Sequence, residues 1–280
     1  MSANQTKITS VWAKVAIYIV LILGAILMLF PFVFMLLTSF KTLGEAMAIP
    51  PVLFPAEFQF QNYAEAMQIA PFDIYFRNTL ISAVGNTILT LIVTIFAAFA
   101  FTRYRFLGNN LIFSLLLATM MVPGEILIIK NYETVAMFGW LDSFEGLIIP
   151  WIANVFYIFL LRQYFMQIPE QLYKAAKIDG CSDIKYLYKI ILPNTKSALV
   201  TIAILNFISS WNAFLWPLLI TNSDEMRVLT IGLTHFTSDA GSDVHLQMAA
   251  ATIIVLPIIV VYLILRKHII SGVTRGGLKG

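Results

Sequence analysis

The side chains that could carry out catalysis are few and widely separated in this 280-residue chain. The three histidines, His235, His245 and His268, show none of the spacings typical of metal ligands. Gly276-Gly277 is too short for a phosphate-binding loop, and no Ser/His/Asp set or paired carboxylates are visible. We therefore expect no catalytic residue, no metal site and no bound cofactor, so an ATP-driven process would need a separate ATPase subunit that uses ATP and Mg.

Polar and aromatic side chains inside two apolar stretches are more informative. Asparagine and serine facing lipid would leave donors and acceptors without partners, so they face other helices or a cavity. Amides, hydroxyls and flat rings are also the groups that bind sugars. Packing between membrane helices explains such residues equally well, and both interpretations stay open. The candidate cavity residues are Asn154, Tyr157, Asn206, Ser209, Ser210, Trp211 and Asn212.

Glu125 follows the helix-breaking pair Pro123-Gly124 in the outer part of a third apolar stretch, and Lys130 lies five residues further on. Ionisable residues at membrane depth are costly and often mark functional sites. A location of both side chains at the outer headgroup level is the alternative, and we favour it.

The composition is that of an integral membrane protein. Hydrophobic residues make up 59% of the chain, charged residues 12%, and the mean hydropathy is +0.83. A soluble domain has about 25% charged residues. The single cysteine, Cys181, excludes an intrachain disulfide. The first apolar run is too long for a cleavable signal peptide.

Six charge-poor runs are long enough to cross a bilayer, which needs about 20 apolar residues. They lie within residues 14–41, 77–103, 105–130, 145–162, 196–224 and 243–266. We expect an all-α integral membrane protein with six transmembrane helices. The proline-broken segment between the first two spans, with a short helix over residues 61–69, forms an outside loop.

Charge asymmetry orients these spans, because cytoplasmic loops carry an excess of Lys and Arg. With the N-terminus in the cytoplasm, 14 of the 18 basic residues lie on that side, and only Lys41, Arg77, Lys130 and Arg227 lie outside. Both termini are therefore predicted to be cytoplasmic, in a multi-pass protein of a prokaryotic inner membrane.

The longest polar interruption, residues 168–193, lies on the cytoplasmic side. The pattern predicts a helix from Glu170 to Ile178 that starts after Pro169 and stops at Asp179-Gly180, where glycine can adopt a left-handed conformation. Ser182 is expected to cap a second helix that ends near Pro193.

One face of the first helix carries small residues. Leu172, Ala175, Ala176 and Asp179 follow the i, i+3, i+4, i+7 pattern and share that face. Such a shallow face lets another protein approach closely. A basic loop lying on anionic lipid is the alternative.

The string IPEQLYKAAKIDG, with ILP downstream, resembles the EAA loop of binding-protein-dependent ABC importers, which forms the coupling helix that docks into the ATPase. Lys174 and Cys181 depart from the family pattern, which favours Glu and Ala there. The residues that match are Ile168, Pro169, Glu170, Leu172, Ala175, Ala176, Asp179, Gly180, Leu192 and Pro193. The resemblance implies that Glu170, Leu172, Ala175, Ala176, Asp179 and Gly180 couple the chain to an ATPase.

The segments MVPGE, LLRQYF, WNAFLWPL and GGLKG extend the resemblance to the carbohydrate-uptake permeases of type I ABC importers, in particular the maltose-system family. It implies a second, non-identical permease subunit, two ATPase subunits and an extracytoplasmic solute-binding protein. In the maltose system most sugar contacts in the membrane belong to the other permease. Members import monosaccharides, oligosaccharides or sn-glycerol 3-phosphate by alternating access.

The resemblance also divides the chain. Residues 1–73 hold the N-terminal segment, first span and outside loop, residues 74–268 the transport core, and residues 269–280 a cytoplasmic tail. The tail is expected to be non-helical and, by resemblance, to insert between the ATPase subunits through Gly276, Gly277, Leu278, Lys279 and Gly280. The polar loop 222–245 is expected to reach the binding protein. An ion-coupled secondary transporter is the remoter alternative, but midplane charges and internal repeats are not evident.

Overall fold

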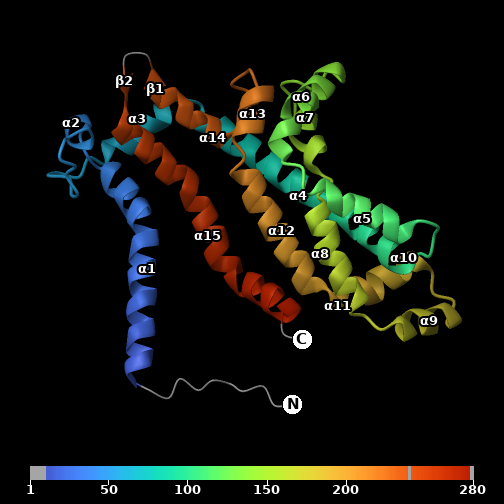
Figure 1. Cartoon of the computed structure of the whole chain (residues 1–280). Helices are drawn as coiled ribbons and strands as arrows, with labels where there is room; N and C mark the ends of the chain where they lie inside the picture. Colours follow the sequence, from blue (N-terminus) through green and yellow to red (C-terminus); the bar gives the residue numbers. More distant parts are fainter. Residues whose placement is uncertain (1–10, 239–240, 278–280) are drawn as a thin grey trace. The chain divides into compact units, whose positions relative to one another are not determined.

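The computed structural model describes residues 11–238 and 241–277 (Figure 1). The chain divides into two compact units, Met1–Ala70 with Leu233–Val255, and Pro71–Gly232 with Leu256–Gly280. The predicted boundary at residues 73/74 lies close to the first division. The predicted core, however, included residues 233–255, which pack with the N-terminal unit.

The first unit is built around α1 (Val11–Thr38), a 28-residue helix whose apolar side chains are mostly exposed, as expected of a helix that faces lipid. The predicted short helix over residues 61–69 is present as α3. The remaining elements are α2 (Leu43–Ala46), α3 (Gln61–Ile69), η4 (Leu233–Phe236), the antiparallel pair β1 (Thr237–Ser238) and β2 (Gly241–Ser242), and the first part of α15 (Val244–Gly277).

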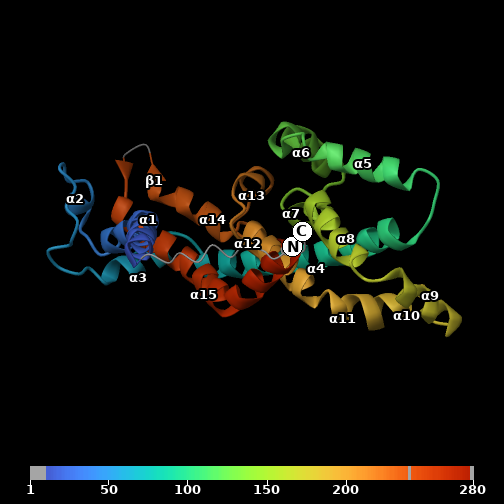
Figure 2. The same ribbon diagram turned by 60° about the horizontal axis from the view of Figure 1, so that its bottom comes forward.

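The second unit is organised around the long helix α4 (Phe72–Arg103), which packs against α8 and α12. The elements after α4 are α5 (Asn109–Thr119), η1 (Gly124–Leu127), α6 (Ile128–Met137), α7 (Phe144–Ile148), η2 (Ile149–Trp151), α8 (Val155–Met166), α9 (Glu170–Ile178), α10 (Asp183–Tyr186), the π-helical turn η3 (Leu187–Ile191), α11 (Leu192–Asn194), α12 (Lys196–Trp211), α13 (Leu215–Ile220) and α14 (Leu229–Gly232). Figures 1 and 2 both place α9 and α10 at one end of this unit, away from α13 and α14.

Three helices in the described part of the chain are long and apolar enough to cross a membrane: α1, α4 and residues 244–264 of α15. Three further pairs pass the same test together but are bent, by 88° between α5 and η1–α6, 49° between α7–η2 and α8, and 81° between α10–α11 and α12. The all-α class is confirmed, whereas the number of six spans stays a prediction.

Two predicted segments differ in detail. The fifth run was expected to be one span over residues 196–224, but α12 ends at Trp211 and α13 begins at Leu215. The tail was expected to be non-helical, but α15 continues to Gly277. Extending a formed helix adds one hydrogen bond for each residue fixed. Residues of low helix propensity can therefore continue a helix that residues of higher propensity have begun. Leu278, Lys279 and Gly280 lie outside the described residues.

Candidate translocation cavity and coupling helix

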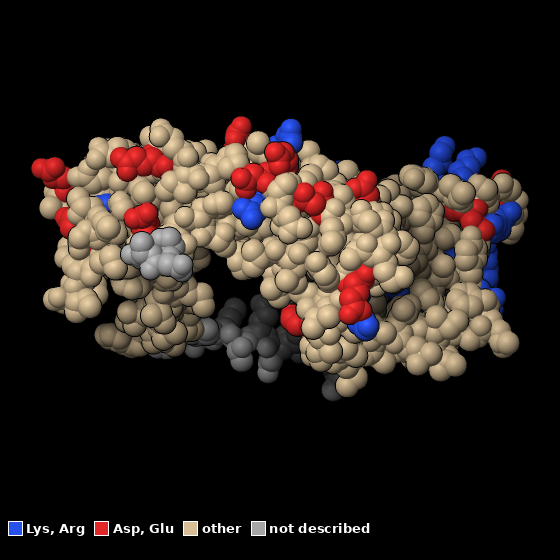
Figure 3. Space-filling model, turned by 90° about the horizontal axis from the view of Figure 1, so that it is seen from above, with Lys and Arg blue, Asp and Glu red and all other residues tan. Residues whose placement is uncertain are grey.

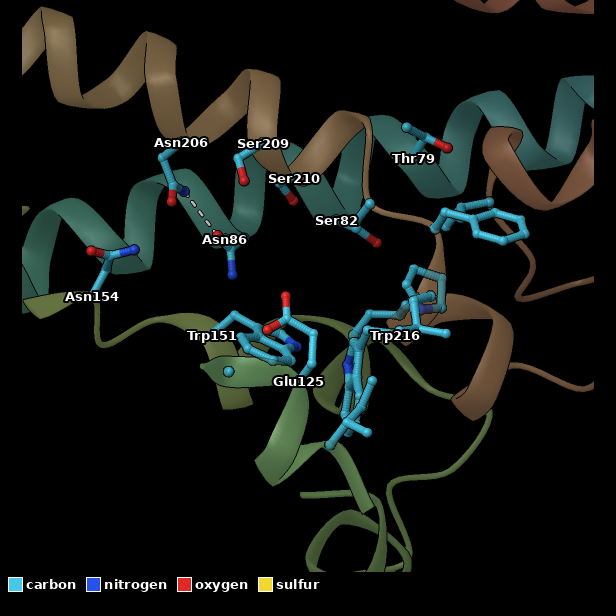
Figure 4. Close-up of a pocket in the computed structure, with 18 residues that line it drawn as sticks. Thr79, Ser82, Asn86, Glu125, Trp151, Asn154, Asn206, Ser209, Ser210 and Trp216 are labelled. Atoms are coloured by element: carbon cyan, nitrogen blue, oxygen red, sulfur yellow. Dashed lines mark hydrogen bonds between the residues drawn. The ribbon is translucent and has the colours of Figure 1, made fainter. Parts of the chain in front are cut away.

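A cavity of about 360 Å³ lies in the second unit between α4, η1, η2, α12 and α13 (Figure 4). Its wall combines amide, hydroxyl and indole groups with one carboxylate. The lining residues are Thr79, Ser82, Asn86, Gly124, Glu125, Ile128, Leu147, Trp151, Asn154, Asn206, Ser209, Ser210, Ala213, Phe214, Leu215, Trp216, Pro217 and Val228.

Four of the seven predicted cavity residues line it: Asn154, Asn206, Ser209 and Ser210. The Asn154 side chain also caps α8, since its Oδ1 accepts from the backbone N–H of Tyr157 at 3.2 Å. The amide therefore has a fixed position at the start of α8, with its NH₂ group left for other contacts.

The other three predicted residues do not line this cavity. Tyr157 is 7% exposed and belongs to a buried cluster with Leu161 and Phe165. Trp211 is buried and packs edge-on against Phe76, with 5.6 Å between ring centroids. Asn212 is exposed, and its Nδ2 donates to the carbonyl of Ile208 at 2.9 Å, at the C-terminal end of α12. A residue type that suits a cavity does not specify which way the side chain points.

The aromatic part of the wall comes from two other tryptophans. Trp151 and Trp216 meet edge to face, with centroids 5.5 Å apart. The Trp216 indole N–H donates to the carbonyl of Gly146 at 3.0 Å, so its ring is held in place, while Trp151 is 38% exposed. Trp151 therefore offers ring surface toward the cavity, in the place that the sequence had assigned to Trp211.

The polar wall contributed by α4 was missed by the sequence analysis. Buried polar residues recur on α4 about once per helical turn, at Asn78 and Thr79, Ser82, Asn86 and Thr87, Thr90 and Thr94. That spacing puts them on one face of a helix, and it could have been found by testing each span for a polar stripe. Asn86 lies at the centre, because the Nδ2 of Asn206 donates to its Oδ1 at 2.8 Å and its own Nδ2 donates to the carbonyl of Ile148 at 3.1 Å.

Asn206→Leu is expected to destabilise the packing of α4 against α12. The substitution removes the stronger donor of the buried Asn86 Oδ1 and leaves only the Thr90 hydroxyl at 3.5 Å. Loss of a buried hydrogen bond of this kind costs about 1–3 kcal/mol. Asn212→Leu is the matched control, because Asn212 is exposed outside the cavity. The thermal unfolding temperature of the purified complex should fall by several degrees for Asn206→Leu and hardly change for Asn212→Leu. Equal unfolding temperatures for the two variants would contradict the assignment.

Glu125 lines the cavity from η1, and Lys130 does not. The Lys130 ammonium instead pairs with Glu133 at 2.6 Å on the exposed surface of α6. The two residues therefore lie in different surroundings, and their location at the outer headgroup level stays a prediction. Pro123-Gly124 separates α5 from η1, and the resulting bend directs Glu125 inward (Figure 4).

The polar stretch of residues 168–193 forms the two helical segments predicted for it. Helix α9 covers Glu170–Ile178, and Gly180 after it has φ of +71°, the left-handed conformation expected at the turn. Ser182 caps α10, since its Oγ accepts from the N–H of Lys185 at 3.3 Å. The helical run that begins at Asp183 ends at Asn194, one residue beyond Pro193.

The face of α9 differs from the prediction in one important residue. Ala176 is 7% exposed and packs in the chain's own buried cluster with Phe165, Tyr186 and Leu187. It therefore cannot belong to a surface that docks into another subunit. Leu172, which is 47% exposed, and the exposed residues Ala175 and Asp179 remain on the open side of the helix.

Asp183 holds α9 against the neighbouring elements. Its carboxylate accepts from Lys177 Nζ at 2.7 Å, from the Tyr173 hydroxyl at 2.7 Å and from the Tyr104 hydroxyl at 3.3 Å. The hydrogen bond to this carboxylate raises the pKa of Lys177. Tyr104 directly follows α4, so the contacts tie α9 to both α10 and the end of α4.

Arg103 strengthens that attachment at the last residue of α4. Its guanidinium donates to the carbonyls of Phe165 and Ile168, at 3.2 and 3.1 Å, and lies over the rings of Tyr173 and Tyr186. These contacts connect α9 to the end of α4, which lines the cavity further along its length.

Glu170 pairs with Arg105 at 3.2 Å and with Lys174 at 3.5 Å. Both pairs are exposed and contribute little to stability. Figure 3 shows Lys and Arg gathered at the end of the second unit that carries α9 and α10. This is the side to which the charge asymmetry assigned the cytoplasm.

The segment 222–245 is less open than the predicted polar loop. Leu229 and Ile231 of α14 are buried, and so is Phe236 of η4. Asp142, in the turn before α7, accepts from the N–H groups of Asn222 and Ser223 at 2.9 and 3.1 Å. The described part of this segment is thus folded against its surroundings rather than free in solvent.

An apolar helical chain with a polar cavity and basic residues gathered at one end has the features of a membrane transport subunit. The model of the family "Binding-protein-dependent transport system inner membrane component" matches residues 90–275. The chain belongs to this family, which confirms the resemblance of its sequence motifs to ABC importer permeases.

Several relatives are similar over nearly their whole length. The arabinooligosaccharides transport system permease protein AraQ of Bacillus subtilis is 33% identical, covering 95% of this chain and 96% of that protein. The diacetylchitobiose uptake system permease protein NgcG of Streptomyces coelicolor is 31% identical, covering 91% and 86%. The sn-glycerol-3-phosphate transport system permease protein UgpE of Yersinia pestis is 31% identical, covering 91% and 94%.

A solved structure has the same fold. It is the crystal structure of a bacterial ABC transporter involved in the import of the acidic polysaccharide alginate, with a TM-score of 0.78 and 25% identity. The match covers 91% of this chain and 95% of that chain.

Proposed function

We propose that this chain is a permease subunit that moves a sugar across the cytoplasmic membrane in an ATP-driven, binding-protein-dependent importer. The observation that carries the proposal is the cavity, because its amides, hydroxyls and the exposed ring of Trp151 are groups that bind a polyhydroxylated molecule. Relatives named for arabino-oligosaccharides and diacetylchitobiose support an oligosaccharide. The relative named for sn-glycerol 3-phosphate supports that compound as the alternative.

The proposed partners are a second, non-identical permease, two ATPase subunits and an extracytoplasmic solute-binding protein. This chain binds no cofactor in the proposal, and the ATPase subunits use ATP and Mg. Family membership supports an ATPase and a binding protein as partners. The docking surface is the open side of α9, formed by Leu172, Ala175 and Asp179.

Alternating access would be driven through α4. One end of α4 contacts α9 and α10 through Arg103 and Tyr104, and Thr79, Ser82 and Asn86 of its polar stripe line the cavity. Movement of α9 with a closing ATPase dimer would therefore shift the cavity wall directly. For the cavity to alternate, ATP and the loaded binding protein must bind with different affinity to its inward-facing and outward-facing states.

Two further contacts belong to the proposal. Gly276, Gly277, Leu278, Lys279 and Gly280 would stabilise the assembly by contacting the ATPase subunits. The segment 222–245 would contact the docked binding protein. Deleting residues 276–280 should weaken ATPase retention, and shortening the segment near Ser242 should lower transport without loss of assembly.

Affinity purification of the tagged chain from cells expressing the whole system tests the partnership. We expect the second permease and the ATPase to be retained in detergent. A chain that is purified alone and transports on its own would contradict the proposal and favour a secondary transporter.

The proposed orientation places α9 and both termini in the cytoplasm. In a Cys181→Ser background, Lys185→Cys should be protected from a membrane-impermeant thiol reagent in intact cells, while Glu225→Cys should react. Both positions are exposed on the surface of the structure, so protection would report the membrane. Reaction of both cysteines from outside would refute the orientation.

A further inference from the structure

Glu125 is the one ionisable side chain among the described residues that line the cavity. The other lining side chains are amides, hydroxyls, indoles and apolar groups, and none is Lys, Arg or His. In Figure 4 the Glu125 carboxylate points toward Asn86, with Trp151 beside it. The cavity wall of this chain therefore carries a fixed negative charge without a compensating cation.

The closest basic side chains in sequence are occupied elsewhere. Lys130 pairs with Glu133 on the surface of α6. The other two cations that the charge pattern assigns to the same side of the second unit are Arg77 of α4 and Arg227, which pairs with Asp224 at 3.1 Å. None of these three side chains lines the cavity, so none is placed to bind an anionic substrate inside it.

Neutral groups are left to bind a neutral ligand. Asn154 Oδ1 is used in capping α8, and its NH₂ group has no hydrogen-bond partner among the described residues. Ser82 Oγ is buried in the cavity wall, also without a partner in the described part of the chain. A carboxylate accepts hydrogen bonds only, so Glu125 suits a ligand rich in hydroxyl donors.

We propose that Glu125 determines the charge class of the substrate, so that the cavity takes an uncharged sugar and rejects anionic ones such as sugar phosphates and uronates. The proposal rests on the proposed function and decides between its two substrate alternatives. Like charges repel, so the Glu125 carboxylate disfavours an anion that binds beside it in the cavity. The hydroxyls of an uncharged sugar can instead donate to the carboxylate.

The charge of the cavity can be measured without knowing the substrate. In the assembled complex carrying Cys181→Ser and Ser209→Cys, the probes are two methanethiosulfonates, one with a trimethylammonium group and one with a sulfonate group. We expect the cationic reagent to label faster than the anionic one. The ratio of the cationic to the anionic labelling rate should fall roughly tenfold when Glu125→Gln is added. Ser210→Cys serves as a second position, and Glu225→Cys as a control whose ratio should not respond to Glu125→Gln.

An unchanged ratio at both cavity positions, or faster labelling by the sulfonate, would overturn the proposal. This measurement needs no transport, so its failure is distinct from failure of the proposed function, which partner purification tests. In cells expressing the whole system, uptake of diacetylchitobiose or arabino-oligosaccharide without uptake of sn-glycerol 3-phosphate would support the proposal. Uptake of sn-glycerol 3-phosphate would overturn it.

Discussion

Complexes carrying Ala176→Trp are expected to lose uptake and substrate-stimulated ATP hydrolysis almost completely. Ala176 is 7% exposed and packs with Tyr186 and Leu187, so an indole ring cannot be placed there without moving α9 away from α10. Overpacking of this kind typically costs about 1–3 kcal/mol. The unfolding temperature of the complex should also fall, because the damage begins inside this chain.

Ala175→Trp is the matched variant on the open side of α9, where the side chain is exposed. It should leave the unfolding temperature of this chain unchanged, yet weaken ATPase retention and coupling because the ring blocks the docking surface. Normal coupling in Ala175→Trp together with normal ATPase retention would show that the open side of α9 is not the docking surface. Normal stability and coupling in Ala176→Trp would contradict its buried location.

The second large effect is expected for Gly146→Ala in α7. A Cβ atom at this position would clash with the backbone oxygen of Trp140 and lie 3.2 Å from Cγ1 of Val135. A clash with a backbone atom cannot be relieved by a side-chain rotation, so α7 must shift. The Gly146 carbonyl also accepts the Trp216 indole N–H, and the shift would therefore disturb the cavity wall. We expect the unfolding temperature to fall by about 5 °C and uptake to drop at least tenfold.

Gly124→Ala is the control for that prediction. Gly124 lines the same cavity, but a Cβ atom there would meet nothing within 4 Å and its backbone φ is not positive. Stability should remain at the wild-type level. A fall as large as that of Gly146→Ala would mean that added volume anywhere near the cavity is harmful, and that the contact with Trp140 is not the cause.

The cytoplasmic helix is the part of the structure that local sequence chemistry predicted best. Pro169, Gly180 and Ser182 are residues whose conformational and capping preferences depend on the backbone next to them. Those preferences gave the bounds of α9, the left-handed turn and the cap of α10. The family resemblance rested on the same residues, and the match over residues 90–275 confirms it.

Side-chain direction was harder to predict, because it depends on contacts distant in sequence. Ala175 and Ala176 are adjacent and chemically identical, yet one is exposed and the other is buried by Tyr186 and Leu187. Trp211 and Trp151 are likewise the same residue type. Only the bend at η2 and the packing of Trp211 on Phe76 decide which ring reaches the cavity.

Uptake into proteoliposomes tests the central claim most directly. The purified complex of this chain with its second permease and ATPase subunits would be reconstituted with the binding protein and radiolabelled diacetylchitobiose or arabino-oligosaccharide on the extracytoplasmic side. We predict accumulation that requires ATP and Mg at the ATPase, requires the binding protein, and is reduced by Ala175→Trp. Accumulation that proceeds without ATP, driven by an ion gradient across this chain alone, would contradict the account.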